Sequence, residues 1–106
     1  MGGFTDLEAW KKSRSLRNAI SKLSKRFPQE EFYRLKDQII RSSRSIGNNI
    51  AEGHGRFHYD DSKKFFINAR GSASETIDHL IIALDEGHID EGTFAHLKTE
   101  CEDCMS

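Results

Sequence analysis

Apolar residues recur at helical spacing along most of this chain, and only one proline interrupts them. Residues on one face of an α-helix lie three or four positions apart, whereas a half-buried strand alternates at every second residue. One proline in 106 residues is also too few for the many turns of an all-β fold. The pattern therefore predicts an all-α fold in a single domain that spans residues 1–106.

Four amphipathic segments can be traced by this spacing. They cover about residues 6–26, 29–52 and 60–86, followed by a short segment after Asp90. Pro28 separates the first two segments, because proline disfavours helical geometry in the residue before it and suits the first turn of a new helix. Four helices with short loops and no strand pattern predict an antiparallel up-and-down four-helix bundle with a short fourth helix.

Small residues interrupt the apolar stripes of the second and third segments. Ser42, Ser43 and Gly47 lie in the second segment, and residues 69–74 form a stretch almost free of large side chains in the third. Because small residues let two helices come close, we expect this stretch to pack against the two serines and Gly47. Gly53 ends the second segment, and we expect Gly53 and Gly55 to turn the chain by adopting positive φ angles.

A line of polar residues runs along the second segment at helical spacing. This polar line consists of Gln38, Arg41, Ser45, Asn49 and Glu52. Covered amides, hydroxyls and acids need hydrogen-bond partners. No base, nucleophile or metal ligand elsewhere in the sequence completes an active site with them. We therefore interpret the line as structural, with Asn49 and Glu52 tying the end of the second helix to the third.

The charge of the chain is divided between its two halves. Residues 1–50 hold 11 Lys and Arg against 5 Asp and Glu, while residues 51–106 hold 5 against 12. The basic helices can pack beside the acidic ones, within a chain or between copies. Alternatively, a basic surface can bind nucleic acid. The candidate contacts for that second interpretation are Lys11, Lys12, Arg14, Arg17, Lys22, Lys25, Arg41 and Arg44.

Catalytic and metal sites find little support in the sequence. A carboxylate di-metal centre in a four-helix bundle needs two Glu-x-x-His motifs, and the chain has none. Cys101 and Cys104 have metal or redox spacing, but the pair occurs only once and two acids lie between the thiols. We expect one inward-facing and one incidental thiol, no cofactor, no metal, no small-molecule substrate and no enzymatic activity. A cryptic enzyme or metal protein that uses the histidines or the cysteine pair is the less favoured alternative.

The location of the protein can also be predicted. No apolar run approaches the roughly 18–20 residues that a membrane-spanning helix needs, and no signal peptide pattern opens the sequence. We therefore expect a cytoplasmic protein with no membrane partner and with reduced cysteines.

Two blocks of residues carry a resemblance to a known family. They are Ser45-Ile46-x-x-Asn49-Ile50-Ala51-Glu52-Gly53 and Ala69-Arg70-Gly71-Ser72. With Leu7, Trp10, Phe27-Pro28 and Glu31, the pattern resembles the bacterial four-helix-bundle proteins encoded in intervening sequences of 23S ribosomal RNA genes. The resemblance extends over about residues 4–90.

The resemblance implies several properties. They are a cytosolic up-and-down bundle, assembly into a homopentamer, and an unproven function for which RNA or ribosome association is suggested. The block residues and their neighbours would then lie at contacts between helices or subunits. This signature set is Gln38, Arg41, Ser45, Asn49, Glu52, Gly53, Arg56, Arg70, Gly71 and Glu75.

Overall fold

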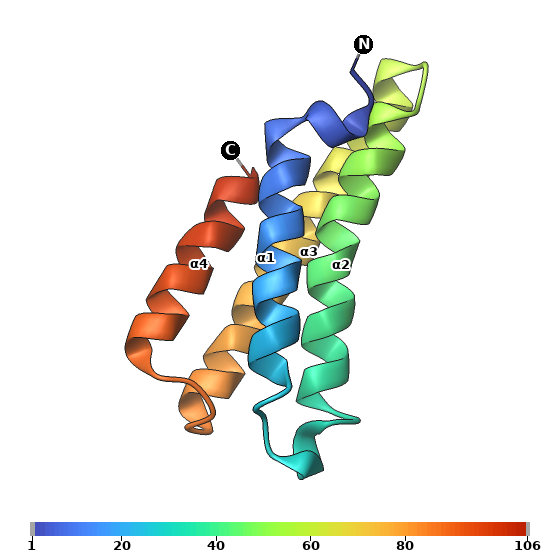
Figure 1. Cartoon of the computed structure of the whole chain (residues 1–106). Coiled ribbons are helices and arrows are strands. Elements are labelled where there is room, and N and C mark those ends of the chain that lie inside the picture. Colours follow the sequence, from blue (N-terminus) through green and yellow to red (C-terminus); the bar gives the residue numbers. More distant parts are fainter. Residues whose placement is uncertain (1, 106) are drawn as a thin grey trace.

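The computed structural model describes residues 2–105, which form four α-helices and two short 3-10 helices. The elements are η1 (Phe4–Asp6), α1 (Glu8–Ser24), η2 (Gln29–Glu31), α2 (Leu35–His54), α3 (Tyr59–Asp85) and α4 (Glu91–Met105). Figure 1 shows successive helices running in alternate directions, with α1 and α3 each packed against both α2 and α4. The predicted four-helix bundle is confirmed, and α4 is its shortest α-helix among the described residues.

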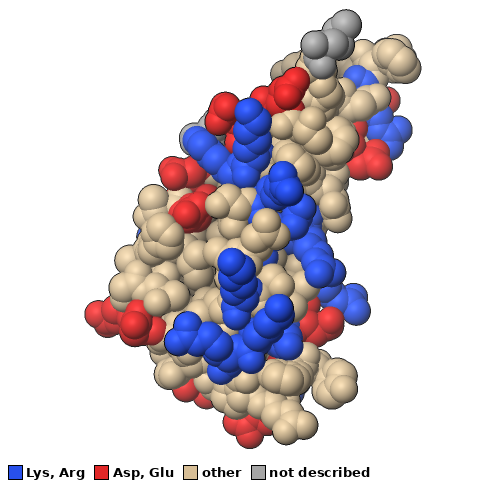
Figure 2. All heavy atoms as spheres, viewed as in Figure 1, with Lys and Arg blue, Asp and Glu red and all other residues tan. Residues whose placement is uncertain are grey.

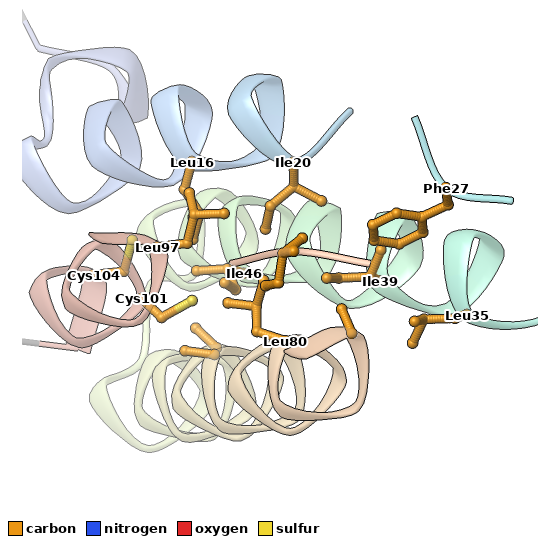
Figure 3. Packing of buried hydrophobic residues seen from close by; sticks show 14 of the residues in the cluster. Leu16, Ile20, Phe27, Leu35, Ile39, Ile46, Leu80, Leu97, Cys101 and Cys104 are labelled. Atoms are coloured by element: carbon orange, nitrogen blue, oxygen red, sulfur yellow. The ribbon is translucent and has the colours of Figure 1, made fainter. Parts of the chain in front are cut away.

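The core is formed by the apolar stripes that the spacing predicted. Leu16 and Ile20 of α1, Ile39 and Ile46 of α2, and Leu80 of α3 are almost fully buried. Figure 3 shows their side chains converging between the helices. Each such side chain contributes about 1.5–3 kcal/mol when it leaves water. This burial holds the bundle together.

Both cysteines of α4 point into the core, so the expectation of one incidental thiol is wrong. Cys101 is 0% exposed and Cys104 is 8% exposed. Burial, followed by nearby charges that include Glu100, raises the pKa of Cys101 to about 12 and that of Cys104 to about 11. The two thiols are therefore protonated packing groups at neutral pH.

The start of α2 differs from the prediction. Helical geometry does not continue from residue 29, because η2 is a single turn and Arg34 has φ −121° and ψ −100°, so α2 begins only at Leu35. This turn directs Glu31 inward, where its Oε2 lies 2.9 Å from Nε2 of His88. A contact with a residue 57 positions away therefore accompanies the interruption of the local helix.

Helices pack closely where the small residues lie, but Gly47 contacts a different helix from the one predicted. Thr76 Oγ1 lies 2.8 Å from Ser42 Oγ, and Ser72 Oγ lies 2.8 Å from Ser45 Oγ, so serines of α2 do meet the small stretch of α3 and the turn that follows it. Gly47 does not face α3. A Cβ placed on Gly47 would lie 2.8 Å from Ser13 Oγ, which shows that this glycine makes room for α1.

The glycines after the polar line do not use positive φ angles. Gly53 lies inside α2, and Gly55 has φ −80°. A Cβ on Gly53 would come within 2.7 Å of the Phe66 ring. Glycine is therefore required at this position because it has no side chain, and not because it can adopt a positive φ angle. Within residues 2–105 the one glycine with positive φ is Gly87, at 76°, where α3 ends with a hydrogen bond from His88 N to Ala83 O.

Candidate functional site

Two residues of the polar line lie in the seam between α2 and α3. Ser45 and Asn49 are half-buried in this seam. Asn49 Nδ2 donates hydrogen bonds to the carbonyl oxygen and Oγ of Ser45, at 2.8 and 3.0 Å. Ser45 in turn meets Ser72 of α3. Ser45 therefore makes the hydrogen bond to α3, whereas the hydrogen bonds of Asn49 stay within α2.

The remaining members of the polar line are exposed. Arg41 Nε lies 3.0 Å from Asp37 Oδ2, and Arg56 Nη2 lies 3.1 Å from Glu52 Oε2. Gln38 is also exposed. The interpretation that Glu52 ties α2 directly to α3 is therefore wrong, because its partner Arg56 lies in the loop after α2, two residues beyond His54. Arg56 makes that connection itself by lying 4.7 Å from the centroid of the Phe65 ring of α3.

The three signature residues of α3 lie on its outer side. Arg70, Gly71 and Glu75 are exposed, and a Cβ on Gly71 would meet nothing within 4 Å. Glu75 Oε2 lies 3.2 Å from Nε2 of His79. Arg70 forms no ion pair with any residue that the structure describes. Two of these signature positions, Arg70 and Gly71, are thus available to a partner.

Sequence reasoning missed a stripe on this same side of α3 that has an exposed isoleucine at each end and small or acidic residues between them. This outer stripe consists of Ile67, Gly71, Ser74, Asp78 and Ile81, all of them exposed and spaced by four, three, four and three residues. Ile67 is 55% exposed and Ile81 is 39% exposed, and the neighbouring Tyr59 and Ile82 are also exposed. The signal was in the sequence, because these isoleucines fall off the core line that contains Ala73 and Leu80.

A basic face covers the outer side of α1. Lys11, Lys12, Arg14, Lys22 and Lys25 are exposed, and Arg17 is half-buried. Figure 2 shows lysine and arginine side chains gathered on the side of the molecule that α1 occupies in Figure 1. Glu8 is the one acidic residue of α1, and it lies 3.6 Å from Lys11. The predicted set of cations on this helix is therefore brought together on one surface.

An aromatic ring and two arginines of α2 lie near this basic face. Arg14 lies 5.9 Å from the centroid of the Trp10 ring, next to a groove of about 510 Å³ that also includes Lys11 and Asn18. Arg44 is exposed and forms no ion pair within residues 2–105, whereas Arg41 is already paired with Asp37. Of the two predicted α2 contacts, Arg44 is thus the freer cation.

Residues 2–105 lack two further kinds of site. No helix between residues 2 and 105 combines the length and apolar character needed to cross a bilayer. Over the same residues, no three His, Cys, Asp or Glu side chains are grouped as ligands of a metal ion.

Comparison with known proteins gives a family and a fold. The model of a family described as 23S rRNA-intervening sequence protein matches residues 5–106. No curated protein matches the sequence. Among solved structures, the chain is similar to a protein of unknown function from the S23 ribosomal protein family of Bacteroides thetaiotaomicron VPI-5482. The two share 23% identity and a TM-score of 0.84, with 92% of this chain and 88% of that chain covered.

Proposed function

The chain belongs to the 23S rRNA-intervening sequence protein family, and from that premise we propose that it is a non-enzymatic binding scaffold that assembles into a closed homopentameric ring. The observation that carries the proposal is the outer stripe of α3. Exposure of isoleucines to water is unfavourable, and the free energy of the system falls when a partner covers them. We further propose that the protein works in the cytoplasm.

A ring requires a heterologous interface, in which two different patches meet around the symmetry axis. The small residues Gly71 and Ser74 at the centre of the outer stripe support such a contact, because another helix can approach there closely. The unequal charges of the two halves of the chain suit an interface in which a basic patch of one copy faces an acidic patch of the next. The signature residues Arg70 and Glu75 lie beside this contact.

The test is sedimentation velocity of the full chain and of matched variants. Ile67→Glu and Ile81→Glu place a charge in the outer stripe, and each should convert the oligomer to a monomer without unfolding it. Tyr33→Glu is the control, since Tyr33 is 94% exposed and lies outside α3. Assembly that survives both isoleucine variants would refute this interface, whether or not the ring itself exists.

We propose RNA binding by the basic face of α1 as a second function. Five exposed cations on one helix with a single acid favour a polyanion, and Trp10 beside Arg14 offers an aromatic surface. Arg44 extends the set, and Arg41 would have to exchange Asp37 for a phosphate.

This second function predicts a specific salt dependence. Each phosphate contact adds about 0.7–0.9 to the slope of log affinity against log salt, so five contacts predict a slope of roughly −4. Arg14→Glu and Lys22→Glu should weaken binding to a structured RNA, whereas Lys64→Glu on α3 should leave it unchanged. A flat salt response, or equal effects of all three variants, would exclude the basic face as the binding surface.

A further inference from the structure

A hollow of about 270 Å³ lies at the end of the bundle where α1 begins and α4 ends. All four helices contribute to its walls. Its apolar lining includes Leu7, Ala9, Ile50, Phe66, Ala69 and Met105. Small side chains at two of these positions leave the space that larger ones would fill. None of the residues that line the hollow belongs to the basic face or to the outer stripe of α3, although Phe66 and Arg70 are sequence neighbours of Ile67 and Gly71 in that stripe.

The Phe66 wall of this hollow is held in place by the packing of α3 on α2. The ring of Phe66 lies directly over Gly53, where any added Cβ would come within 2.7 Å of Cε1. The ring remains 41% exposed in spite of this contact. Its other side lines a second groove of about 240 Å³ that includes Ser62, Ile67 and Arg70, so Arg70 borders both spaces. Phe66 thus stands between these two spaces, which are called the inner hollow and the outer groove below.

Charge at the rim indicates what the hollow can bind. Arg70 lines it and forms no ion pair with the residues that the structure describes. Glu8 also lines it, but the Glu8 carboxylate already lies 3.6 Å from Lys11. The thiol of Cys104 in the wall is protonated at neutral pH and adds no negative charge. The rim therefore presents one unpaired guanidinium beside an apolar space.

We propose that this hollow binds a small amphiphilic carboxylate, with its alkyl chain among the apolar side chains and its carboxylate on Arg70. A guanidinium pairs with a carboxylate through two parallel hydrogen bonds, which fixes the orientation of the ligand. The volume lies just below the range of about 300–1,000 Å³ that is typical of small-molecule sites, so a chain of about eight carbons is the expected size. This site goes beyond the proposed scaffold function, and its Arg70 lies beside the proposed subunit contact.

The experiment is isothermal titration calorimetry of the full chain with hexanoate, heptanoate and octanoate. Affinity should rise by about fourfold for each added methylene, because each one leaves water for an apolar wall. Arg70→Gln should weaken octanoate binding by roughly tenfold or more, since it removes a charged hydrogen-bond donor pair. The same variant should leave the binding of octanol unchanged. Arg44→Gln is the charge control, because Arg44 is an exposed arginine of α2 that forms no ion pair within residues 2–105.

Two bulky variants distinguish the inner hollow from the outer groove. Met105→Trp fills the inner hollow from the last turn of α4 and should abolish binding. Ser62→Trp fills the outer groove and should have no effect. No binding at millimolar octanoate, equal affinities along the series, an unchanged affinity in Arg70→Gln, or loss of binding only in Ser62→Trp would each overturn the proposal. So would octanoate binding that appears only when dilution dissociates the oligomer, because a second copy would then be the occupant.

Discussion

Gly47→Ala tests whether the contact between α1 and α2 depends on the absence of one methyl group. An alanine in the middle of a helix is favoured over glycine by about 1 kcal/mol. At this position, however, the new Cβ would lie 2.8 Å from Ser13 Oγ, which is buried and donates a hydrogen bond to Trp10 O at 2.6 Å. Overpacking of this kind costs about 1–3 kcal/mol, so the net change should be a destabilisation of about 0–2 kcal/mol.

The same substitution should have the opposite sign in a Ser13→Ala background. Removing Oγ leaves Ser13 Cβ as the nearest atom of that side chain, at 3.7 Å, which is an ordinary contact. Gly47→Ala should then stabilise the protein by about 1 kcal/mol, so that the two sites are coupled by about 1–3 kcal/mol. Urea unfolding followed by circular dichroism measures all four proteins of the cycle. If Gly47→Ala has the same effect in both backgrounds, the steric explanation is refuted.

Three further predictions concern single sites. Gly71→Ala adds a methyl group that meets nothing within 4 Å, so it should stabilise the isolated chain by about 1 kcal/mol in urea unfolding; a loss of stability under dissociating conditions would contradict the helix assignment. The pKa of Glu31 is lowered mainly by its hydrogen bond to His88, so its contribution to stability is present above about pH 4.5 and is lost as the pH falls through the lowered value. In Glu31→Gln the free energy of unfolding should therefore fall less steeply as the pH is lowered below about 4.5. An unchanged pH dependence in this range would contradict the contribution of the Glu31–His88 pair. Cys101 and Cys104, with pKa values raised to about 12 and 11, should resist a neutral-pH thiol reagent until the protein unfolds, and rapid labelling of the native protein would show that α4 detaches.

Helix number and core residues could be predicted because they depend on local spacing. Leu16 and Ile20 in α1, and Ile39 and Ile46 in α2, are buried where the three- and four-residue steps place them. The energetic reason is that each helix has one clearly apolar side, and burying that side against the other helices is favourable. Pro28 likewise marked the right junction between the first two segments, because its effect on the preceding residue is local.

The features that sequence reasoning missed depend on contacts between distant residues. The late start of α2 accompanies the contact between Glu31 and His88, and no pattern within residues 28–35 announces that partner. A glycine inside a helix, such as Gly47, indicates that another helix packs closely there. It does not indicate which helix that is, and in the structure the neighbour is α1 and not α3. The sequence predicts that Gly53 is a turn residue, because glycine usually serves where the backbone needs an unusual conformation, whereas in the structure Gly53 makes room for the Phe66 ring.

The outer stripe of α3 was missed for a different reason. This helix carries apolar residues on two sides, with Ala73 and Leu80 inward and Ile67 and Ile81 outward. Periodicity alone selects the stronger face and leaves the weaker one unassigned. An apolar residue that falls off the core line of a helix is therefore the signal to examine for subunit contacts.

The proposed ring is tested most directly by the native mass of the protein. Each chain has a mass of 12.1 kDa, and native mass spectrometry at micromolar concentration should give a single species of about five times that value. The exposed isoleucines of α3 would then be covered between neighbouring copies. A species of 12.1 kDa under the same conditions would contradict the account, because the outer stripe would then face water in the native protein.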